Sequence, residues 1–329
     1  MMAFSCTFFN CNDEPAWDNF MLNKSMNGTF LQTRKFINYH KDGKFQDCSV
    51  IIRKGSEIVA LILACVVEEE GKKTFFAHKG TTFGGITIAK SVYSASSIDE
   101  ITKALLFFLQ ENGFQKIYLK MVPNLYQREN TDLLDYFLVK NDFKCYNELN
   151  YYLDLRKYRD DIAAQFSSSK RRDYRYSLKS GFTFRKLDTR EEIAAYYQIL
   201  LMNLNKLGLK PVHTLDDLFD LKFNRFEDRI EFFGVYKERE MVAGSMLFRF
   251  NDKLVHTQYL SSDENYLKFF PMDFLIYNLI ESAINCGMEI FSFGICTENQ
   301  GRYLNLGLSR FKEGFGTQFC INRSYEKDL

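Results

Sequence analysis

The sequence predicts a duplicated α/β fold, because a similar order of elements occurs in both halves of the 329-residue chain. Each half contains a pair of apolar strands, a further strand, a helix that ends at a glycine, and a last strand. A helix with one apolar face and flanking strands is best buried against a sheet. We therefore expect two mixed α/β domains, and we expect ligand sites where two such units meet.

The first half shows this order between residues 49 and 122. Ser97 and Glu100 have the spacing of a capping box, so the helix is expected to begin at Ser97. Gly113 is expected to end it, since glycine readily adopts the left-handed conformation that follows a helix. The expected strands are residues 49–52, 58–67, 74–78 and 116–122.

The second half repeats the order. Pro271 fits the first helical turn, where no amide donor is needed, and Gly287 is expected to end this helix. The offset between the matching strand pairs is larger than the offset between the two glycines, so the first half is expected to carry extra loop. The expected strands are residues 231–236, 241–250, 253–260 and 289–295.

Length and composition agree with two domains, which we place at residues 1–155 and 156–329. The chain is 46% hydrophobic, enough for two cores at roughly 100–200 residues per domain. The 43 basic and 42 acidic residues leave a formal charge of +1. Because this charge is close to zero, a general attraction to nucleic acid is not indicated, and any site for a polyanion must be local.

The sequence also bears on membranes, location and metals. Its longest apolar run, residues 58–67, is about half of the roughly 20 residues that span a bilayer, so no membrane span is expected. Residues 1–20 lack the pattern of a secretory signal, which favours a cytoplasmic protein. The eight cysteines form no C-x-x-C pair and only four histidines accompany them, so no metal site is expected.

A basic segment joins the two halves. If a helix begins at Ser169, then Arg171, Arg175 and Lys179 recur every four residues and form one stripe. Guanidinium groups bind phosphate oxygens in pairs, so this stripe is a candidate phosphate site. The alternative is a basic helix face in contact with solvent.

Several short segments together resemble one known family. They are Lys170-Arg171-Arg172, residues 179–182, Gly287, residues 291–294, Gly301 and residues 311–316. In this combination, the chain from about residue 30 to residue 319 resembles the FemABX group of double-GNAT acyltransferases, to which BioF2-like acetyltransferase domains are related. Residues 78–85 are also similar to a loop found in such proteins in bacterial envelope or polysaccharide gene settings.

The resemblance implies two GNAT domains of the acyl-CoA N-acyltransferase fold, with acyl transfer to an amine in or near the cleft between them. The first domain would take the acceptor and the second the acyl donor, which in the wider group is acyl-CoA or aminoacyl-tRNA. This chain has neither the long helical hairpin of the aminoacyl-tRNA enzymes nor the acyl-CoA loop pattern of single GNAT domains. The donor therefore stays open, and a tRNA partner is an alternative that the net charge does not indicate.

The resemblance also implies catalytic residues in the second half. Two parallel strands, residues 253–261 and 289–295, should splay apart, and the helix from Pro271 should point its amino end at the donor, a position suited to phosphate. Lys312 matches the lysine of the family's F-K-x-x-F motif and would stabilise the oxyanion or hold a donor phosphate. The alternative is a strand lysine that faces solvent.

Two further side chains are candidates for proton transfer. Glu298 follows the last strand in a loop and could take the amine's proton, although a solvated loop glutamate is the alternative. Tyr259, on a predicted strand, could protonate the leaving group, and the alternative for it is packing in the core or at its rim.

Residues 78–85 supply the candidate acceptor site. His78 could bind a hydroxyl or phosphate group of the acceptor, or be a structural histidine. Gly84 and Gly85 allow close backbone approach, so their amides could line an anion site, or they could form only a tight loop.

Taken together, these features predict an acyltransferase that forms an amide on an amine of a sugar, a peptidoglycan precursor or another envelope molecule, with a small-molecule or nucleotide-sugar acceptor. One alternative is acetyl-CoA-dependent N-acetylation of a small amine. Another is a catalytically silent module that binds a nucleotide-sugar or a partner protein with the same fold.

Overall fold

The computed structural model describes residues 4–41, 43–206 and 208–329, and the chain divides into two compact units. The first unit contains the residues up to Glu148 together with Ile321–Leu329, and the second contains Leu149–Cys320. The sequence-based ranges 1–155 and 156–329 differ from these units mainly at the C-terminus, because the last strand returns to the first unit.

The first unit contains a four-stranded antiparallel sheet in the order β1-β3-β4-β7 and part of a second sheet in the order β17-β8-β6-β5-β2. Strands β6 and β8 are parallel, and α3 connects them along the chain. Apolar side chains of α3, among them Ile101 and Leu105, pack with Ile117 and Leu119 of β8. The elements are β1 Phe4–Phe8, α1 Glu14–Asn19, α2 Arg34–Ile37, β2 Gln46–Asp47, β3 Val50–Lys54, β4 Glu57–Ile62, β5 Cys65–Glu69, β6 Lys72–Ala77, β7 Ile86–Ile88, α3 Ala95–Glu111, β8 Lys116–Lys120 and α4 Asp132–Lys140.

The apolar run of residues 58–67 is not the single strand that its composition predicts. It forms β4 and β5, which belong to different sheets. The chain changes sheet at Leu63 and Ala64, where the Ser49 hydroxyl accepts a hydrogen bond from the Ala64 N–H at 3.0 Å and donates one to the Ala64 carbonyl at 3.2 Å. Both residues are buried, so their hydropathy carries no sign of the break.

The expected start of α3 at Ser97 is wrong by one turn. Ser94 caps this helix, because its hydroxyl accepts a hydrogen bond from the Ser97 N–H at 3.4 Å. The end of the helix is as predicted, since Gly113 follows it with a φ of 74°. Serine occurs at positions 94, 96 and 97, so spacing alone did not identify the capping residue.

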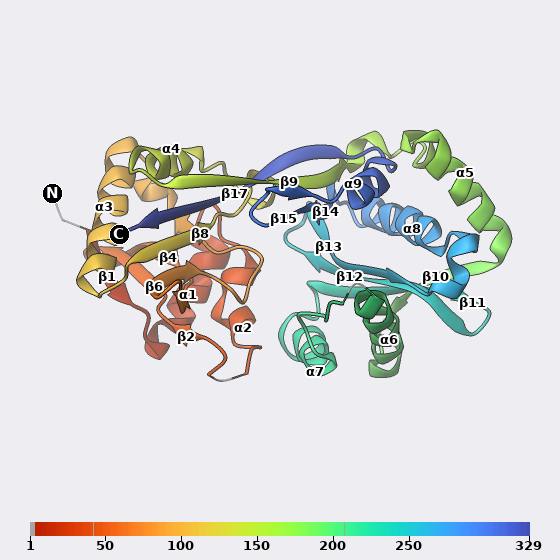
Figure 1. Ribbon diagram of the computed structural model, residues 1–329, viewed down its shortest axis with the longest axis horizontal. Coiled ribbons are helices and arrows are strands. Elements are labelled where there is room, and N and C mark those ends of the chain that lie inside the picture. The colour runs from red at the N-terminus through yellow and green to blue at the C-terminus, as the bar shows by residue number, and fades with distance from the viewer. Residues whose placement is uncertain (1–3, 42, 207) are drawn as a thin grey trace. The chain divides into compact units, whose positions relative to one another are not determined.

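The second unit is built on one mixed sheet in the order β10-β11-β12-β13-β14-β9, in which only β13 and β14 pair in parallel. In Figure 1, α8 covers one face of this sheet, and α6 and α7 lie on the other. The helices are α5 Ser168–Ser177, α6 Arg190–Lys206, α7 Leu215–Phe219, α8 Pro271–Asn285 and α9 Leu306–Glu313. The strands are β9 Lys144–Asp154, β10 Phe182–Leu187, β11 Ile230–Lys237, β12 Glu240–Arg249, β13 Leu254–Ser262, β14 Ile290–Ile295, β15 Thr297–Glu298, β16 Tyr303–Leu304 and β17 Gln318–Asp328.

The duplication predicted from the sequence is confirmed in the topology of each unit. The first contains β5 and β6, then β7 of the four-stranded sheet, and then α3 and β8, and the second contains β12-β13-α8-β14. In both series an antiparallel pair is followed by a helix and by a strand parallel to the second strand of the pair. The predicted match of residues 49–52 and 58–67 with residues 231–236 and 241–250 is wrong, because the match begins at β5, whereas β3 and β4 belong to the separate four-stranded sheet of the first unit.

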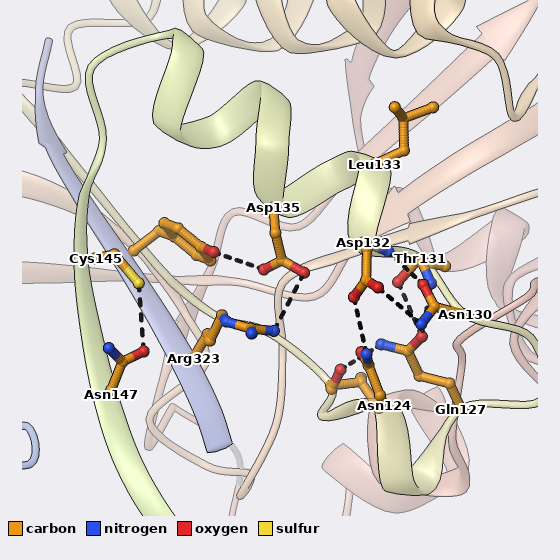
Figure 2. Close-up of polar contacts among 12 residues, drawn as sticks. Asn124, Gln127, Asn130, Thr131, Asp132, Leu133, Asp135, Cys145, Asn147 and Arg323 are labelled. Carbon is orange, nitrogen blue, oxygen red and sulfur yellow. Dashed lines mark hydrogen bonds and ion pairs between the residues drawn. The ribbon is translucent and has the colours of Figure 1, made fainter. Parts of the chain in front are cut away.

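The C-terminal part of β17 belongs to the first unit, where its backbone pairs with β8 and its side chains contact α4. Tyr325, which is 1% exposed, pairs with Leu119 of β8, and its hydroxyl donates to Asp135 of α4 at 2.6 Å. Figure 2 shows Asp135 of α4 facing Arg323 of β17, and their N···O distance is 3.8 Å. The C-terminal residues thereby pair with β8 in the sheet β17-β8-β6-β5-β2 and contact Asp135 in the first turn of α4.

Candidate functional site

The strands β13 and β14 of the second unit separate after a short parallel pairing. Their register pairs end at His256 and Ser292, while β13 continues to Ser262 along β12. At the point of separation the Thr257 hydroxyl donates to the Ser292 carbonyl at 3.3 Å, in place of a backbone bond. This divergence leaves one edge of β13 outside the ladder with β14, as a GNAT-like sheet requires.

A bulge at Gly294 turns β14 at this point. The register with β9 shifts between Ser292 and Gly294, and Gly294 has a φ of 74°. A Cβ atom at Gly294 would lie 3.0 Å from Cε1 of the buried His256 ring. Glycine is required here because a side chain would meet both left-handed backbone strain and this ring.

Lys312 holds the end of β14. Its ammonium donates to the carbonyl oxygens of Phe293 at 2.8 Å, Gly294 at 3.1 Å and Ile295 at 2.9 Å. The residue is 4% exposed, and burial is the main cause that lowers its pKa, while the neighbouring Cys296 acts in the opposite direction. Lys312 is therefore not a strand residue facing solvent: it lies on α9 beside the divergence. A direct bond to a reacting oxygen would require exchange of one of its three carbonyl partners.

Lys170 brings together the segments that carry the family resemblance. Its ammonium forms an ion pair with Asp273 of α8 at 2.8 Å and lies 4.7 Å and 5.0 Å from the ring centroids of Phe311 and Phe315. Gly314 also packs closely against this side chain, because a Cβ atom at Gly314 would lie 2.7 Å from Lys170 Cγ. The start of α5, the start of α8 and the F-K-x-x-F segment therefore meet at one side chain.

The amino end of α8 carries a carboxylate. Phe270, in a left-handed conformation, precedes Pro271, and Asp273 in the first turn is 4% exposed. Burial raises the pKa of Asp273, and Lys170 acts against this rise. A phosphate group at this turn would approach a carboxylate that already neutralises the helix end, which disfavours the phosphate position expected there.

Tyr259 lies on β13 beyond the divergence and is half-buried. Its hydroxyl accepts a hydrogen bond from the Val212 N–H at 3.2 Å and lies 2.8 Å from Nδ1 of His213. Burial raises the pKa of Tyr259, whereas the hydrogen bonds from Val212 and Gln258 act against the rise. The tyrosine was predicted from the sequence, but the histidine, which lies 46 residues away along the chain, was not.

Glu298 does not lie in the loop that the sequence predicted after β14. It lies on β15, which pairs with β16 in a short hairpin, and its side chain is exposed. Asn299 and Gln300 follow it with positive φ values of 49° and 55°, which form the tight reversal. Its assignment as proton acceptor stays a prediction.

The basic stripe is helical, but its members differ. The helix α5 ends at Ser177, so Lys179 lies in the 3₁₀ turn that follows. Arg171 is half-buried and donates to the carbonyls of Ala164 and Phe166 at 3.2 Å and 3.1 Å. Arg175 is exposed. Of the two predicted phosphate ligands, Arg175 has the more accessible guanidinium group.

His78 is buried in the first unit. Its Nδ1 accepts a hydrogen bond from the Gly80 N–H at 2.8 Å, and its ring packs against Phe45. Burial lowers the pKa of His78 from 6.5 to about 3. The imidazole is therefore neutral at physiological pH and stabilises its own loop.

Gly84 and Gly85 also pack tightly. The Gly84 N–H donates to the Lys120 carbonyl at 2.9 Å, and the Gly84 carbonyl accepts from Gln32 Nε2 at 2.9 Å. A Cβ atom at Gly84 would lie 2.3 Å from the Ala77 carbonyl oxygen. Gly85 has a φ of 69°. These contacts favour the tight-loop alternative over an anion site, because the Gly84 amide is already bonded.

Among the residues that the structure describes, no three or more His, Cys, Asp or Glu side chains gather as a metal site would require. Within the same residues, none of the helices has both the length and the apolar character needed to cross a bilayer.

Residues 166–313 match the family described as the acetyltransferase (GNAT) domain. A search of curated proteins found no match to the sequence. Among solved structures, the crystal structure of FemX is similar over 99% of this chain and 97% of its own, with a TM-score of 0.70 and 13% identity.

Two further structures share the fold. The C-terminal domain of a putative lysylphosphatidylglycerol synthetase from Agrobacterium fabrum has a TM-score of 0.61 at 10% identity, over 97% of this chain and 93% of that one. A tandem GNAT protein from the clavulanic acid biosynthesis pathway has a TM-score of 0.56 at 8% identity, over 99% of this chain and 98% of that one.

Proposed function

Starting from a chain with the FemABX-like double-GNAT fold, we propose that this protein is an acyltransferase that forms an amide on an amine of a sugar, a peptidoglycan precursor or another cell-envelope molecule. The observation that carries the proposal is the divergence of β13 and β14, with the Tyr259 hydroxyl on the diverging part of β13. Such a gap admits an activated acyl group beside free backbone donors.

The described residues suggest how the chemistry would proceed. The attacking nitrogen forms a bond to the acyl carbon, and the bond from that carbon to the donor's oxygen or sulfur breaks. Tyr259 supplies a proton to the departing atom. Lys312 acts through the backbone, because its three bonds fix the carbonyls of Phe293–Ile295 and so set the shape of the gap.

The choice of donor follows from charge. The carboxylate of Asp273 lies in the turn where a donor phosphate was expected, while Arg175 is exposed on α5. This arrangement favours a donor whose phosphates contact α5, and aminoacyl-tRNA and acyl-CoA are the two classes to compare. The double charge reversal Arg171→Glu/Arg175→Glu is expected to abolish donor binding. An unchanged affinity for the donor would show that the basic stripe is only a helix face in contact with solvent.

The test is a transfer assay with two donor arms, acetyl-CoA and aminoacyl-tRNA, against a panel of amino sugars and envelope precursors, with products identified by mass spectrometry. We expect an amide product in one arm, and a loss of about 10²-fold or more in Tyr259→Phe. Tyr236→Phe, the same change on β11, is the matched control. Ligands that co-purify would be identified in the same way.

The outcomes separate the alternatives. Product only from acetyl-CoA and simple amines would indicate a small-amine N-acetyltransferase. Binding of a nucleotide-sugar without product in either arm would indicate a silent binding module and refute the proposal.

A further inference from the structure

The loop between α6 and α7 places a histidine against the hydroxyl of Tyr259. His213 is 4% exposed, and its Nδ1 lies 2.8 Å from Tyr259 Oη. Tyr259 itself is half-buried, so this pair joins a buried imidazole to a tyrosine that is only partly removed from solvent.

The surroundings of Tyr259 Oη indicate the direction of this hydrogen bond. The Val212 N–H donates to the oxygen at 3.2 Å, and Gln258 is a further donor that stabilises the phenolate. With N–H groups directed at the oxygen, the hydroxyl proton is best placed on the bond to Nδ1, which then acts as acceptor.

The loop holds His213 in place from both sides. The Tyr197 hydroxyl of α6 donates to the His213 carbonyl at 3.2 Å. Thr214, the next residue, caps α7 through a capping box with Asp217. A histidine fixed by a helix on one side and a cap on the other keeps its ring orientation without a bound ligand.

We propose that His213 is the proton acceptor of the reaction and acts through Tyr259: as the amine nitrogen bonds to the acyl carbon, its proton passes to Tyr259 Oη while the hydroxyl proton passes to His213 Nδ1. The departing oxygen or sulfur then takes a proton back along the same path. No proton is gained or lost by the protein over the cycle. This inference rests on the proposed function and assigns the proton acceptor to His213 in place of the exposed Glu298.

The relay should be visible in the pH dependence of kcat/KM. Within the described part of the chain, the titratable groups that face Tyr259 include Tyr196 and Tyr197 of α6 and His213, and the charged residues Asp216 and Asp217 lie at the start of α7. The tyrosines are neutral at acid and neutral pH. In the proposed relay, activity is therefore expected to fall along an acid limb as the His213 imidazole takes a proton.

The first experiment compares the wild-type protein with His213→Asn, whose amide can bond to the Tyr259 hydroxyl but cannot take a proton. We expect kcat/KM at pH 7 to fall by about 10²-fold and the acid limb to disappear, while KM changes little. An unchanged acid limb, or a loss of less than about threefold, would overturn the relay.

A second measurement needs no activity. The chain has four histidines, so two-bond ¹H–¹⁵N spectra resolve their rings, and His213→Asn assigns the His213 signal. We expect a neutral ring protonated at Nε2, with a changed Nδ1 shift in Tyr259→Phe; a ring protonated at Nδ1 would refute the relay. If the wild-type protein transfers no acyl group from any donor, the proposed function fails instead.

Discussion

The buried ring of His78 makes the first unit sensitive to acid, and the size of the effect follows from its surroundings. His78 is 2% exposed, and burial lowers its pKa from 6.5 to about 3. Between these values the unfolded chain binds a proton that the folded chain does not, so stability falls as pH falls. At about 1.4 kcal/mol per pH unit, moving from pH 7 to pH 5 should remove about 2 kcal/mol through this residue.

The variant His78→Asn isolates the effect. An asparagine oxygen can accept the Gly80 N–H in place of Nδ1, but it does not titrate. The only tryptophan of the chain, Trp17, is buried in the first unit, so its fluorescence reports the unfolding of that unit alone.

The assay is urea denaturation at pH 7 and pH 5, followed by Trp17 fluorescence. The wild-type protein should lose about 2 kcal/mol more than His78→Asn between the two values. Equal losses would show that His78 is protonated in the folded protein, and would refute the argument from burial.

Three further predictions concern packing and charge. Lys312→Met leaves three carbonyls without their donor, so the free energy of unfolding of the second unit, measured by urea and circular dichroism, should fall by about 3 kcal/mol; a loss under about 1 kcal/mol would contradict this. Gly84→Ala should lower the free energy of unfolding by about 3 kcal/mol, because the new methyl group would clash with Ala77. The control Gly113→Ala, where the space is open, should lower it by only about 1 kcal/mol. Equal losses in the two variants would disprove the clash. Lys170→Met should lower the free energy of unfolding by about 3 kcal/mol in the same assay, because it leaves the buried Asp273 carboxylate unpaired. Adding Asp273→Asn removes that carboxylate and should restore part of the lost stability. Strictly additive losses from the two changes would contradict the ion pair's role.

The sequence was sufficient for the duplicated fold because helix ends and strand pairs leave local signals. Pro271 and Gly287 bound α8 closely, and the parallel strand after it follows from the order of elements. The break between β4 and β5 was not predicted, because both sides of it are buried and apolar. It depends on the Ser49 side chain, which is distant along the chain from Ala64.

For the candidate site, the sequence indicated residues but not their partners. Lys312 was identified through its motif, yet its three bonds to β14 depend on the bulge at Gly294, which no local pattern shows. Tyr259 was identified on its strand, whereas His213 reaches it from a loop before α7. Contacts between distant segments decide what each side chain can do, and hydrophobic periodicity does not encode them.

The path of the last strand has a practical consequence for anyone who dissects this protein. A fragment that stops at Glu148 would lack Ile321–Leu329, and so would expose the edge of β8 and remove the Tyr325 bond to Asp135. Open strand edges recruit other chains, so such a fragment is expected to aggregate. A workable excision would graft the C-terminal segment back through a short linker, in the manner of a circular permutant.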